Sequence, residues 1–145
     1  MSTGFVAGLT PGPRAGSVAG MRAKDAVGQY GQRVAEQHLT DAGLTVIARN
    51  WRCADGELDI VATEGDVLVF CEVKTRSSTA FGDPAEAVLG AKAIRLRRLA
   101  LRWLAEQKAF GEPRFWPELR FDVVSVLRQP RGAATVRHLR GALGW

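Results

Sequence analysis

Apolar and polar residues alternate along the middle of the chain in a pattern that predicts the strands of a sheet. Two runs rich in β-branched residues, 58–63 and 67–75, flank turn residues at 64–66, which predicts a β-hairpin. The second run is almost continuously apolar, as is typical of a buried central strand. A further run at 44–52 alternates Leu, Val and Ile with Thr and Ala, which predicts a strand just before the hairpin.

Helices are predicted on both sides of these strands. In 23–42, apolar residues recur at spacings of three and four, and Gly43 follows as a natural stop. A second, longer helical region is expected to begin at Pro84, with Asp83 as its N-cap. Its apolar residues also form a stripe at the helical period, so both helices have one face to bury against the sheet.

The rest of the chain completes an α/β pattern in the order α-β-β-β-α-β. A segment rich in Pro and Gly, 111–117, separates the second helix from a strand at 119–127, and 135–139 is expected to add a short edge strand. Residues 1–20 are rich in small residues without periodicity and predict a disordered tail. The remaining residues, 21–145, are long enough for a single domain with one core.

Charged residues lie within the best strands of this pattern. Asp59 is on the first hairpin strand, and Glu72 and Lys74 share one face of the second. If the hairpin pairs about Gly65, Asp59 lies level with Glu72, and a buried pair of carboxylates is costly unless it is neutralised. Hard oxygen ligands of this kind suit Mg²⁺ or Mn²⁺, with the Val73 carbonyl as a further ligand and water in the remaining positions.

Four sequence blocks in this order resemble a known family. They read Gly-Glu-Leu-Asp-Ile-Val at 56–61, Leu-Val-Phe-Cys-Glu-Val-Lys-Thr-Arg at 68–76, Phe-Gly-Asp-Pro at 81–84 and Arg-Phe-Asp-Val-Val at 120–124. An Asp on one strand followed by Glu-x-Lys on the next resembles the PD-(D/E)XK nuclease superfamily. The linked blocks, spanning roughly 26–139, resemble the YraN family of bacterial proteins. This resemblance implies a restriction-endonuclease-like fold, with a mixed central sheet flanked by helices.

The resemblance also implies a metal-dependent nuclease that hydrolyses phosphodiester bonds. Asp59 and Glu72 would hold Mg²⁺ or Mn²⁺, and Lys74 would orient or deprotonate a water or stabilise the transition state. A nucleic-acid-binding protein that has lost cleavage is the main alternative, and a buried ion-pair network is another. For Asp122 an ion pair with Arg120 is expected rather than a metal contact. Branched or structured DNA is the substrate suggested by analogy of fold alone.

The first helix holds a departure from the family pattern. That pattern is approximately G-x-x-G-E, whereas here Gly28 and Gly31 are followed by Gln32. Gln32 can bond a metal-bound water but carries no charge, and Glu36, one turn later, is either its substitute at the site or a solvated helix residue. The two glycines are expected to allow the helix backbone to approach a strand or a phosphate closely.

A net charge of +5 and a pI of about 9.9 weakly favour a polyanionic partner, although an ordinary excess of Arg would give the same balance. Trp51, between basic residues, either stacks on a base or closes the edge of the core. Loop and helix cations either contact a nucleic acid, which we expect to be DNA, or are merely solvated. The expected contacts are Arg49, Arg52, Arg76, Lys92, Arg95, Arg98 and Arg102.

Other classes of protein find little support in the sequence. No apolar run is long enough to span a membrane, and no signal peptide is expected at the start of the chain. Cys53 and Cys71 form no CxxC pair and are expected to be reduced thiols in a cytoplasmic protein. Walker A, G-x-S-x-G and HExxH motifs are lacking, and His38 and His138 stand alone in the sequence. DNA against RNA, and monomer against homodimer, stay open.

Overall fold

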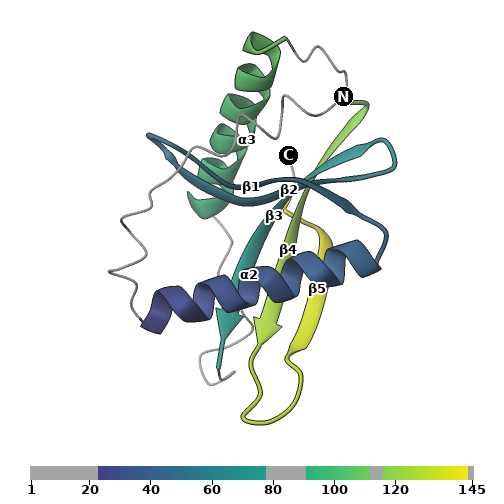
Figure 1. Cartoon of the computed structure of the whole chain (residues 1–145). Coiled ribbons are helices and arrows are strands. Elements are labelled where there is room, and N and C mark those ends of the chain that lie inside the picture. The colour runs from purple at the N-terminus through teal and green to yellow at the C-terminus, as the bar shows by residue number, and fades with distance from the viewer. Residues whose placement is uncertain (1–22, 78–90, 112–115, 144–145) are drawn as a thin grey trace.

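The computed structural model of the chain describes residues 23–77, 91–111 and 116–143, which form one mixed five-stranded sheet and two helices (Figure 1). The strands lie in the order β1-β2-β3-β4-β5, and only β3 and β4 pair in parallel. This is the predicted α/β class, consistent with a restriction-endonuclease-like fold. The elements are α2 (Ala23–Asp41), β1 (Thr45–Cys53), β2 (Gly56–Glu64), β3 (Val67–Arg76), α3 (Ala91–Ala109), β4 (Glu118–Leu127) and β5 (Thr135–Leu143).

The predicted elements are confirmed with small differences at their ends. The last strand is longer than expected: β5 runs to Leu143, whose side chain is buried in the core and keeps the segment paired with β4. The tail at 1–20 and the expected helix start at Pro84 lie outside the described residues. Neither of the two helices described is long and apolar enough to cross a membrane.

Strand β3 is held differently by its two neighbours. The β2–β3 hairpin pairs from Glu64 with Val67 to Ile60 with Cys71, which confirms the predicted register about Gly65. The parallel β3–β4 ladder continues further, to Arg76. Because the ladder with β2 ends at Cys71, residues 72–76 of β3 continue in backbone pairing with β4 only.

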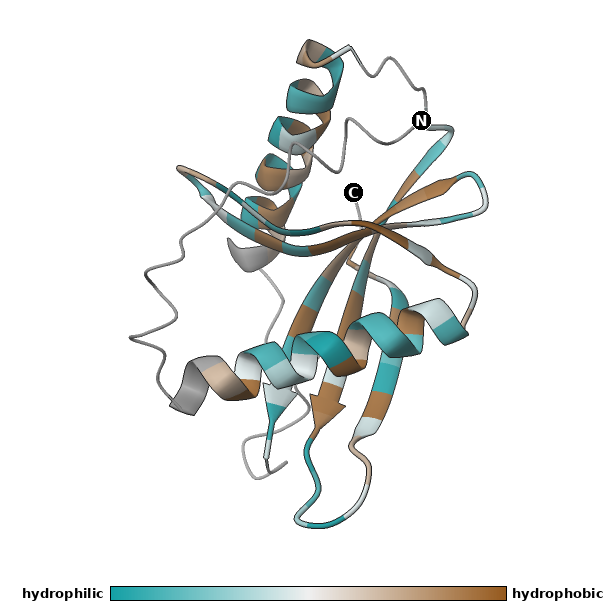
Figure 2. Ribbon diagram, in the orientation of Figure 1, coloured by the Kyte–Doolittle hydropathy of each residue, from teal (hydrophilic) through white to brown (hydrophobic). Residues whose placement is uncertain are grey.

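Each face of the sheet packs against one helix, and hydropathy follows this arrangement (Figure 2). The α3 face of the sheet, covered by α3, packs an apolar core in which the rings of Phe70 and Trp103 meet edge to face at 5.9 Å. The α2 face, covered by α2, packs a second core that contains Ala35 and Leu39 of the helix. Successive residues of β3 alternate between these cores, as the period of a strand requires.

Helix α2 approaches β3 closely at one glycine. A Cβ built at Gly31 would clash with the Thr75 side chain, so a larger residue would push the helix away from the strand. One residue earlier, the ring of Tyr30 lies 5.4 Å from the guanidinium of Arg128, just beyond β4. The expectation of a close approach is therefore confirmed at Gly31, and it is wrong for a strand at Gly28, where a Cβ would meet no atom within 4 Å.

Polarity changes along β3 on the α3 face only. Leu68 and Phe70 belong to the core on this face, whereas the next residues on the same face are Glu72, Lys74 and Arg76. On the α2 face the core continues to the same level, with Val124 and Val126 of β4 fully buried. One end of the sheet is thus apolar under α2 and polar on its other face.

Strict alternation along 58–63 predicts Leu58 on the face of Ile60, and that prediction is wrong. Leu58 packs in the α3-side core with Val61, whereas Ile60 packs in the α2-side core. The change occurs at Asp59, where β2 has passed the last residue that pairs with β3. Beyond that point β2 follows β1 over α3, because Gly56 lies against Leu99 of that helix.

Candidate functional site

Asp59 lies at the point where β2 leaves β3. The antiparallel register would place it opposite Glu72, one step beyond the last ladder pair, Ile60 with Cys71. The Val73 N–H of β3 donates to the Asp59 side chain rather than to a backbone carbonyl of β2. The distance from the amide nitrogen to Asp59 Oδ2 is 2.9 Å. This bond fixes the carboxylate beside the backbone that separates Glu72 from Lys74.

Glu72 and Lys74 form an ion pair on the α3 face. Lys74 Nζ lies 3.3 Å from Glu72 Oε2, and the side chains are 22% and 12% exposed for Lys74 and Glu72 respectively. Both follow Phe70 on the same face of β3, so they sit directly beyond the edge of the α3-side core. The structure therefore brings Asp59, Glu72 and Lys74 together, as the register of the hairpin predicts.

The surroundings of Asp59 raise the pKa of its carboxyl group. Burial, followed by repulsion from Glu72, raises the pKa of Asp59 to about 7, and Glu57 adds to the rise. The Val73 amide and Lys74 oppose this shift without cancelling it. We refer to Glu57, Asp59, Glu72 and Lys74 as the Asp59 cluster.

Glu57 extends this cluster toward the start of β2. Burial raises the pKa of the Glu57 carboxyl, Arg52 opposes the rise, and the charge of Glu72 adds to it. Arg52 Nη2 lies 3.6 Å from Glu57 Oε1, but the Arg52 side chain is largely exposed. A solvated guanidinium neutralises a neighbour weakly, which explains why the pKa of Glu57 stays high.

The donor set can accept a hard divalent cation. Two carboxylates that repel each other, with Glu57 nearby, would be relieved by a cation between them, and oxygen donors suit Mg²⁺ or Mn²⁺. Across the described residues, however, no three His, Cys, Asp or Glu side chains are already gathered as a metal centre. A protein that supplies one or two carboxylates and leaves the other positions to water fits Mg²⁺ better than ions that need a full protein cage.

The two candidate residues on α2 are placed differently from the cluster. Gln32 is half-buried and follows Gly31 on the helix over the α2 face, whereas Glu72 and Lys74 lie on the α3 face. Glu36 forms an ion pair with Arg49 of β1, with Arg49 Nε 2.9 Å from Glu36 Oε2. The contact of Glu36 is thus with a strand at the sheet edge, and the same pair occupies a cation that was expected to bind nucleic acid.

Some of the expected nucleic-acid contacts are partnered by acidic residues. Arg102 Nη1 lies 2.9 Å from Asp55 Oδ2 in the β1–β2 turn, although Glu106 is one helical turn further along α3. Glu106 instead accepts a hydrogen bond from the indole Nε1 of Trp51 at 3.2 Å. Because Trp51 is buried in the α3-side core, its role is to close the core rather than to stack on a base.

The other expected contacts are on β3 and on α3. Arg76 is the last residue of the strand, on the face of Glu72 and Lys74. Arg95 and Arg98 are exposed on α3, and the Arg95 side chain passes Gly56 at the start of β2, beside Glu57. For Lys92 the helix position is described, but the side chain lies outside the described residues.

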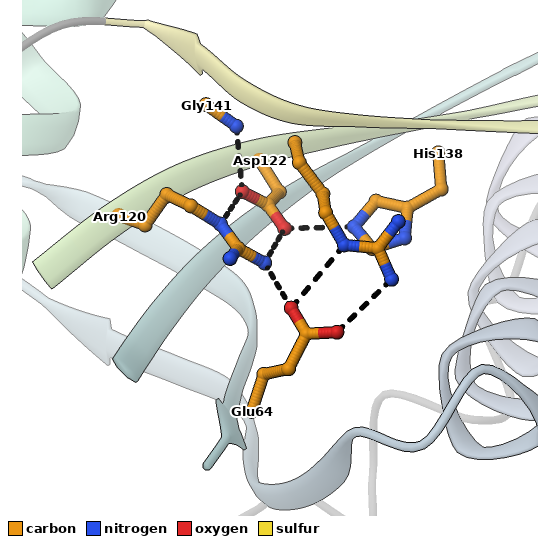
Figure 3. A network of polar contacts seen from close by, with 6 residues as sticks. Glu64, Arg120, Asp122, His138 and Gly141 are labelled. Atoms are coloured by element: carbon orange, nitrogen blue, oxygen red, sulfur yellow. Dashed lines mark hydrogen bonds and ion pairs between the residues drawn. The ribbon is translucent and has the colours of Figure 1, made fainter. Parts of the chain in front are cut away.

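A second group of charges, which we call the Asp122 network, lies on the α2 face near the β2–β3 turn (Figure 3). Asp122 accepts hydrogen bonds from Arg120 Nε at 2.8 Å, from the Gly141 amide at 3.0 Å and from His138 Nε2 at 2.7 Å. The expected Arg120–Asp122 pair is confirmed, and the network also includes Glu64, His138 and Arg140.

The histidines are therefore not isolated in the fold. His138 bonds Asp122, and its ring lies 6.4 Å from that of His38 on α2, edge to face. In the sequence, charged or polar residues two apart, at 120 and 122 and again at 138 and 140, are the available signal. That spacing puts each pair on one face of its strand, but it does not reveal that the two strands are neighbours.

Known proteins are similar to this chain over most of its length, including the residues of the candidate site. The model of the uncharacterised protein family UPF0102 matches residues 31–126, which include Asp59, Glu72 and Lys74. A UPF0102 protein of Beutenbergia cavernae is 62% identical over 121 residues, which cover 83% of this chain and 98% of that protein. One of Frankia alni is 57% identical over 84% of this chain and 98% of its own length. One of Streptomyces coelicolor is 53% identical over 88% of this chain and 95% of its own length.

Proposed function

This chain belongs to the uncharacterised protein family UPF0102, the YraN family, and we propose that it is a metal-dependent nuclease that hydrolyses phosphodiester bonds in DNA. The observation that carries the proposal is the Asp59 cluster: repelling carboxylates beside a lysine, at the polar end of a central strand. Buried groups with strongly perturbed pKa values concentrate at functional sites.

Asp59 and Glu72 would hold Mg²⁺ or Mn²⁺, with the Val73 carbonyl as a further ligand. When bound, such an ion would lower the pKa of a coordinated water and neutralise charge on the scissile phosphate. The Val73 amide orients the Asp59 carboxylate through its 2.9 Å hydrogen bond. This preorganisation matters because a ligand held in place does not have to reorganise during the reaction.

Lys74 would act on the phosphate. Its ammonium is held 3.3 Å from the Glu72 carboxylate, and Glu72 is one of the proposed ligands of the ion. There it would donate to a phosphate oxygen or to the attacking water and stabilise the charge that develops in the transition state. Arg76, on the same face of β3, would contact the phosphate backbone next to it.

The partner would be DNA, held by a cation at the end of β3 and by exposed cations on α3. Arg76, Arg95 and Arg98 support this, and the net charge of +5 favours a polyanion. Arg49 and Arg102 pair with Glu36 and Asp55, and we expect them to contribute less. Free thiols at Cys53 and Cys71 support a reducing, cytoplasmic location.

A nucleic-acid-binding protein without cleavage is the second candidate. Gln32 replaces the acid of the family pattern, and Glu36 is engaged by Arg49 at 2.9 Å. Neither residue therefore supplies an obvious extra charge for the metal. If the two carboxylates of Asp59 and Glu72 hold the ion too weakly, the fold would bind DNA and leave it intact.

The experiment is cleavage of labelled duplex, single-stranded, flap and four-way-junction DNA and of RNA, with Mg²⁺, Mn²⁺ or EDTA. We expect cleavage that requires the metal, reduced about 10²-fold or more in rate by Lys74→Ala. Lys108→Ala is the matched control, because it removes another lysine from an exposed position on α3. Equal rates for the two variants would contradict the role of Lys74. Binding without cleavage by the wild type would support the second candidate and make Gln32→Glu the next variant.

A further inference from the structure

Three residues on neighbouring strands form a row across the polar end of the sheet. Lys74 of β3 is in parallel register with Ser125 of β4, and Ser125 is in antiparallel register with Arg137 of β5. Adjacent strands are about 4.8 Å apart, so the backbones that carry the two cations are separated by about 10 Å. The sequence gives no hint of this row, because 63 positions separate its first and last members.

All three side chains start from the α3 face. The residues that flank Arg137 lie on the other face: Val136 packs on the α2-side core, and the ring of His138 meets that of His38 on α2. Ser125 is likewise flanked by Val124 and Val126 of the α2-side core. Because side chains alternate along a strand, Ser125 and Arg137 project to the face that carries Lys74.

The row adjoins the Asp59 cluster at one end only. Lys74 belongs to both, at 3.3 Å from Glu72, whereas Arg137 is exposed on the edge strand two strands away. Ser125, between them, is buried and short, so the two long cationic side chains rise on either side of it. On this face, the described part of the α3-side core reaches β5 at Leu139, and Arg137 is the next residue beyond it.

We infer that Arg137 is a phosphate-binding residue, and that a DNA strand crosses the sheet from Lys74 over Ser125 to Arg137. Lys74 would contact the phosphate at the Asp59 cluster, and Arg137 a phosphate further along the same strand. An arginine suits this position, because its planar guanidinium bonds phosphate oxygens in pairs. The inference rests on the proposed function for its partner, DNA, but it does not require that the DNA be cleaved.

The test is binding of a short fluorescein-labelled DNA single strand to the full chain, followed by fluorescence anisotropy in EDTA at several salt concentrations. Arg137→Gln should raise Kd roughly three- to tenfold at low salt and reduce the slope of log K against log salt by about 0.7, as for one lost phosphate contact. Arg137→Lys should keep most of the slope, because it keeps the charge. Arg33→Gln, which removes an exposed arginine from α2, is the matched control and should change neither quantity.

Each outcome bears on the inference. A loss in Arg137→Gln that Arg33→Gln does not share, with unchanged melting temperatures, supports it. Equal effects of the two variants, or a wild type that does not bind the strand, overturn it. Cleavage is measured separately: a nuclease whose binding is insensitive to Arg137 would keep the proposed function and lose this strand path. Binding that depends on Arg137, in a protein that does not cleave DNA, would support the strand path and contradict the proposed nuclease function.

Discussion

The Asp122 network and the Asp59 cluster both bury carboxylates in one sheet, yet their electrostatics are opposite. Burial would raise the pKa of Asp122, but hydrogen bonds from His138, Arg120 and the Gly141 amide hold it at about 2. For Asp59, burial and repulsion from Glu72 raise the pKa to about 7. The carboxylate of Asp122 accepts hydrogen bonds from several donors, whereas the carboxylate of Asp59 lies beside acidic side chains.

The difference follows from the groups that set the pKa of each carboxyl group. The Asp122 side chain is fully buried, and Arg120 bridges it to Glu64, which in turn pairs with Arg140. Around Asp59, the charges of Glu72 and Glu57 raise the pKa, and the ammonium of Lys74, which pairs with Glu72, does not cancel them. A fold gains stability from the first arrangement and loses stability from the second, so the second needs another explanation. The proposed cation between Asp59 and Glu72 would supply one.

The pH dependence separates the two sites. The lowered pKa of Asp122 stabilises the fold above the unfolded-state value of 3.8, and this stabilisation is lost as the pH falls through about 2. The raised pKa of Asp59 has the reverse sign. Its neutral form is favoured in the fold, so stability is lost as the pH rises from 3.8 through about 7.

The largest expected effect is the loss of stability when the carboxylate of Asp122, with its several hydrogen bonds, is removed. Asp122→Ala should lower the free energy of unfolding by about 3–5 kcal/mol, because it leaves Arg120 and the buried His138 without their shared partner. Urea unfolding at pH 7, followed by tryptophan fluorescence, measures this loss. Asp66→Ala, in the exposed hairpin turn, is the control and should change stability by less than about 0.5 kcal/mol.

If Asp122→Ala does not fold, Asp122→Asn provides the same comparison with the shape of the side chain preserved. We expect it to fold and to lose less, because its amide oxygen still accepts one of the hydrogen bonds. A loss no larger than that of Asp66→Ala would show that the network does not stabilise the fold, and the contrast with Asp59 would disappear.

The next effect has the opposite sign. Asp59→Asn should raise the free energy of unfolding by about 2 kcal/mol at pH 8 in EDTA, because it removes a charge whose pKa is about 7 and keeps an acceptor for the Val73 amide. At pH 5 the gain should fall by more than half, since the wild-type carboxyl is then largely protonated in the fold. Urea unfolding at both pH values measures the difference.

Mn²⁺ sharpens this prediction. Added at pH 8, it should stabilise the wild type and have little effect on Asp59→Asn, because a ligand that binds only the folded state shifts unfolding. Glu118→Gln, on an exposed position of β4, controls for the removal of one negative charge. A destabilised Asp59→Asn protein at both pH values would mean that the carboxylate is a structural group and not a cation ligand.

The sequence predicts the hairpin and the meeting of Asp59 with Glu72, because both follow from local rules. A turn about Gly65 and a side-chain period of two fix which residues face each other. The same rules fail at Leu58, because there β2 has left β3 and follows α3 instead. A prediction from side-chain alternation holds only where the assumed pairing of the two strands continues.

The Asp122 network lies beyond such rules. Glu64 meets Arg120 and Arg140 across 56 and 76 positions of the chain, and only the strand order makes them neighbours. The pairing of Arg102 with Asp55 likewise joins residues 47 positions apart, one on α3 and the other in the β1–β2 turn. Long-range partners of charged residues require the tertiary fold.

The smallest expected effect tests whether the exposed residue Arg140 contributes less to stability than the buried residue Asp122 of the same network. Arg140→Gln should lower the free energy of unfolding by less than about 1 kcal/mol, because its side chain is 45% exposed and Glu64 keeps Arg120 at 2.7 Å. The loss should shrink at high salt, since exposed pairs are screened. A double-mutant cycle with Glu64→Gln in urea unfolding measures the coupling. A coupling energy as large as the loss in Asp122→Ala would place Arg140 in the centre of the network, and the simple division between buried and exposed charges would have to be abandoned.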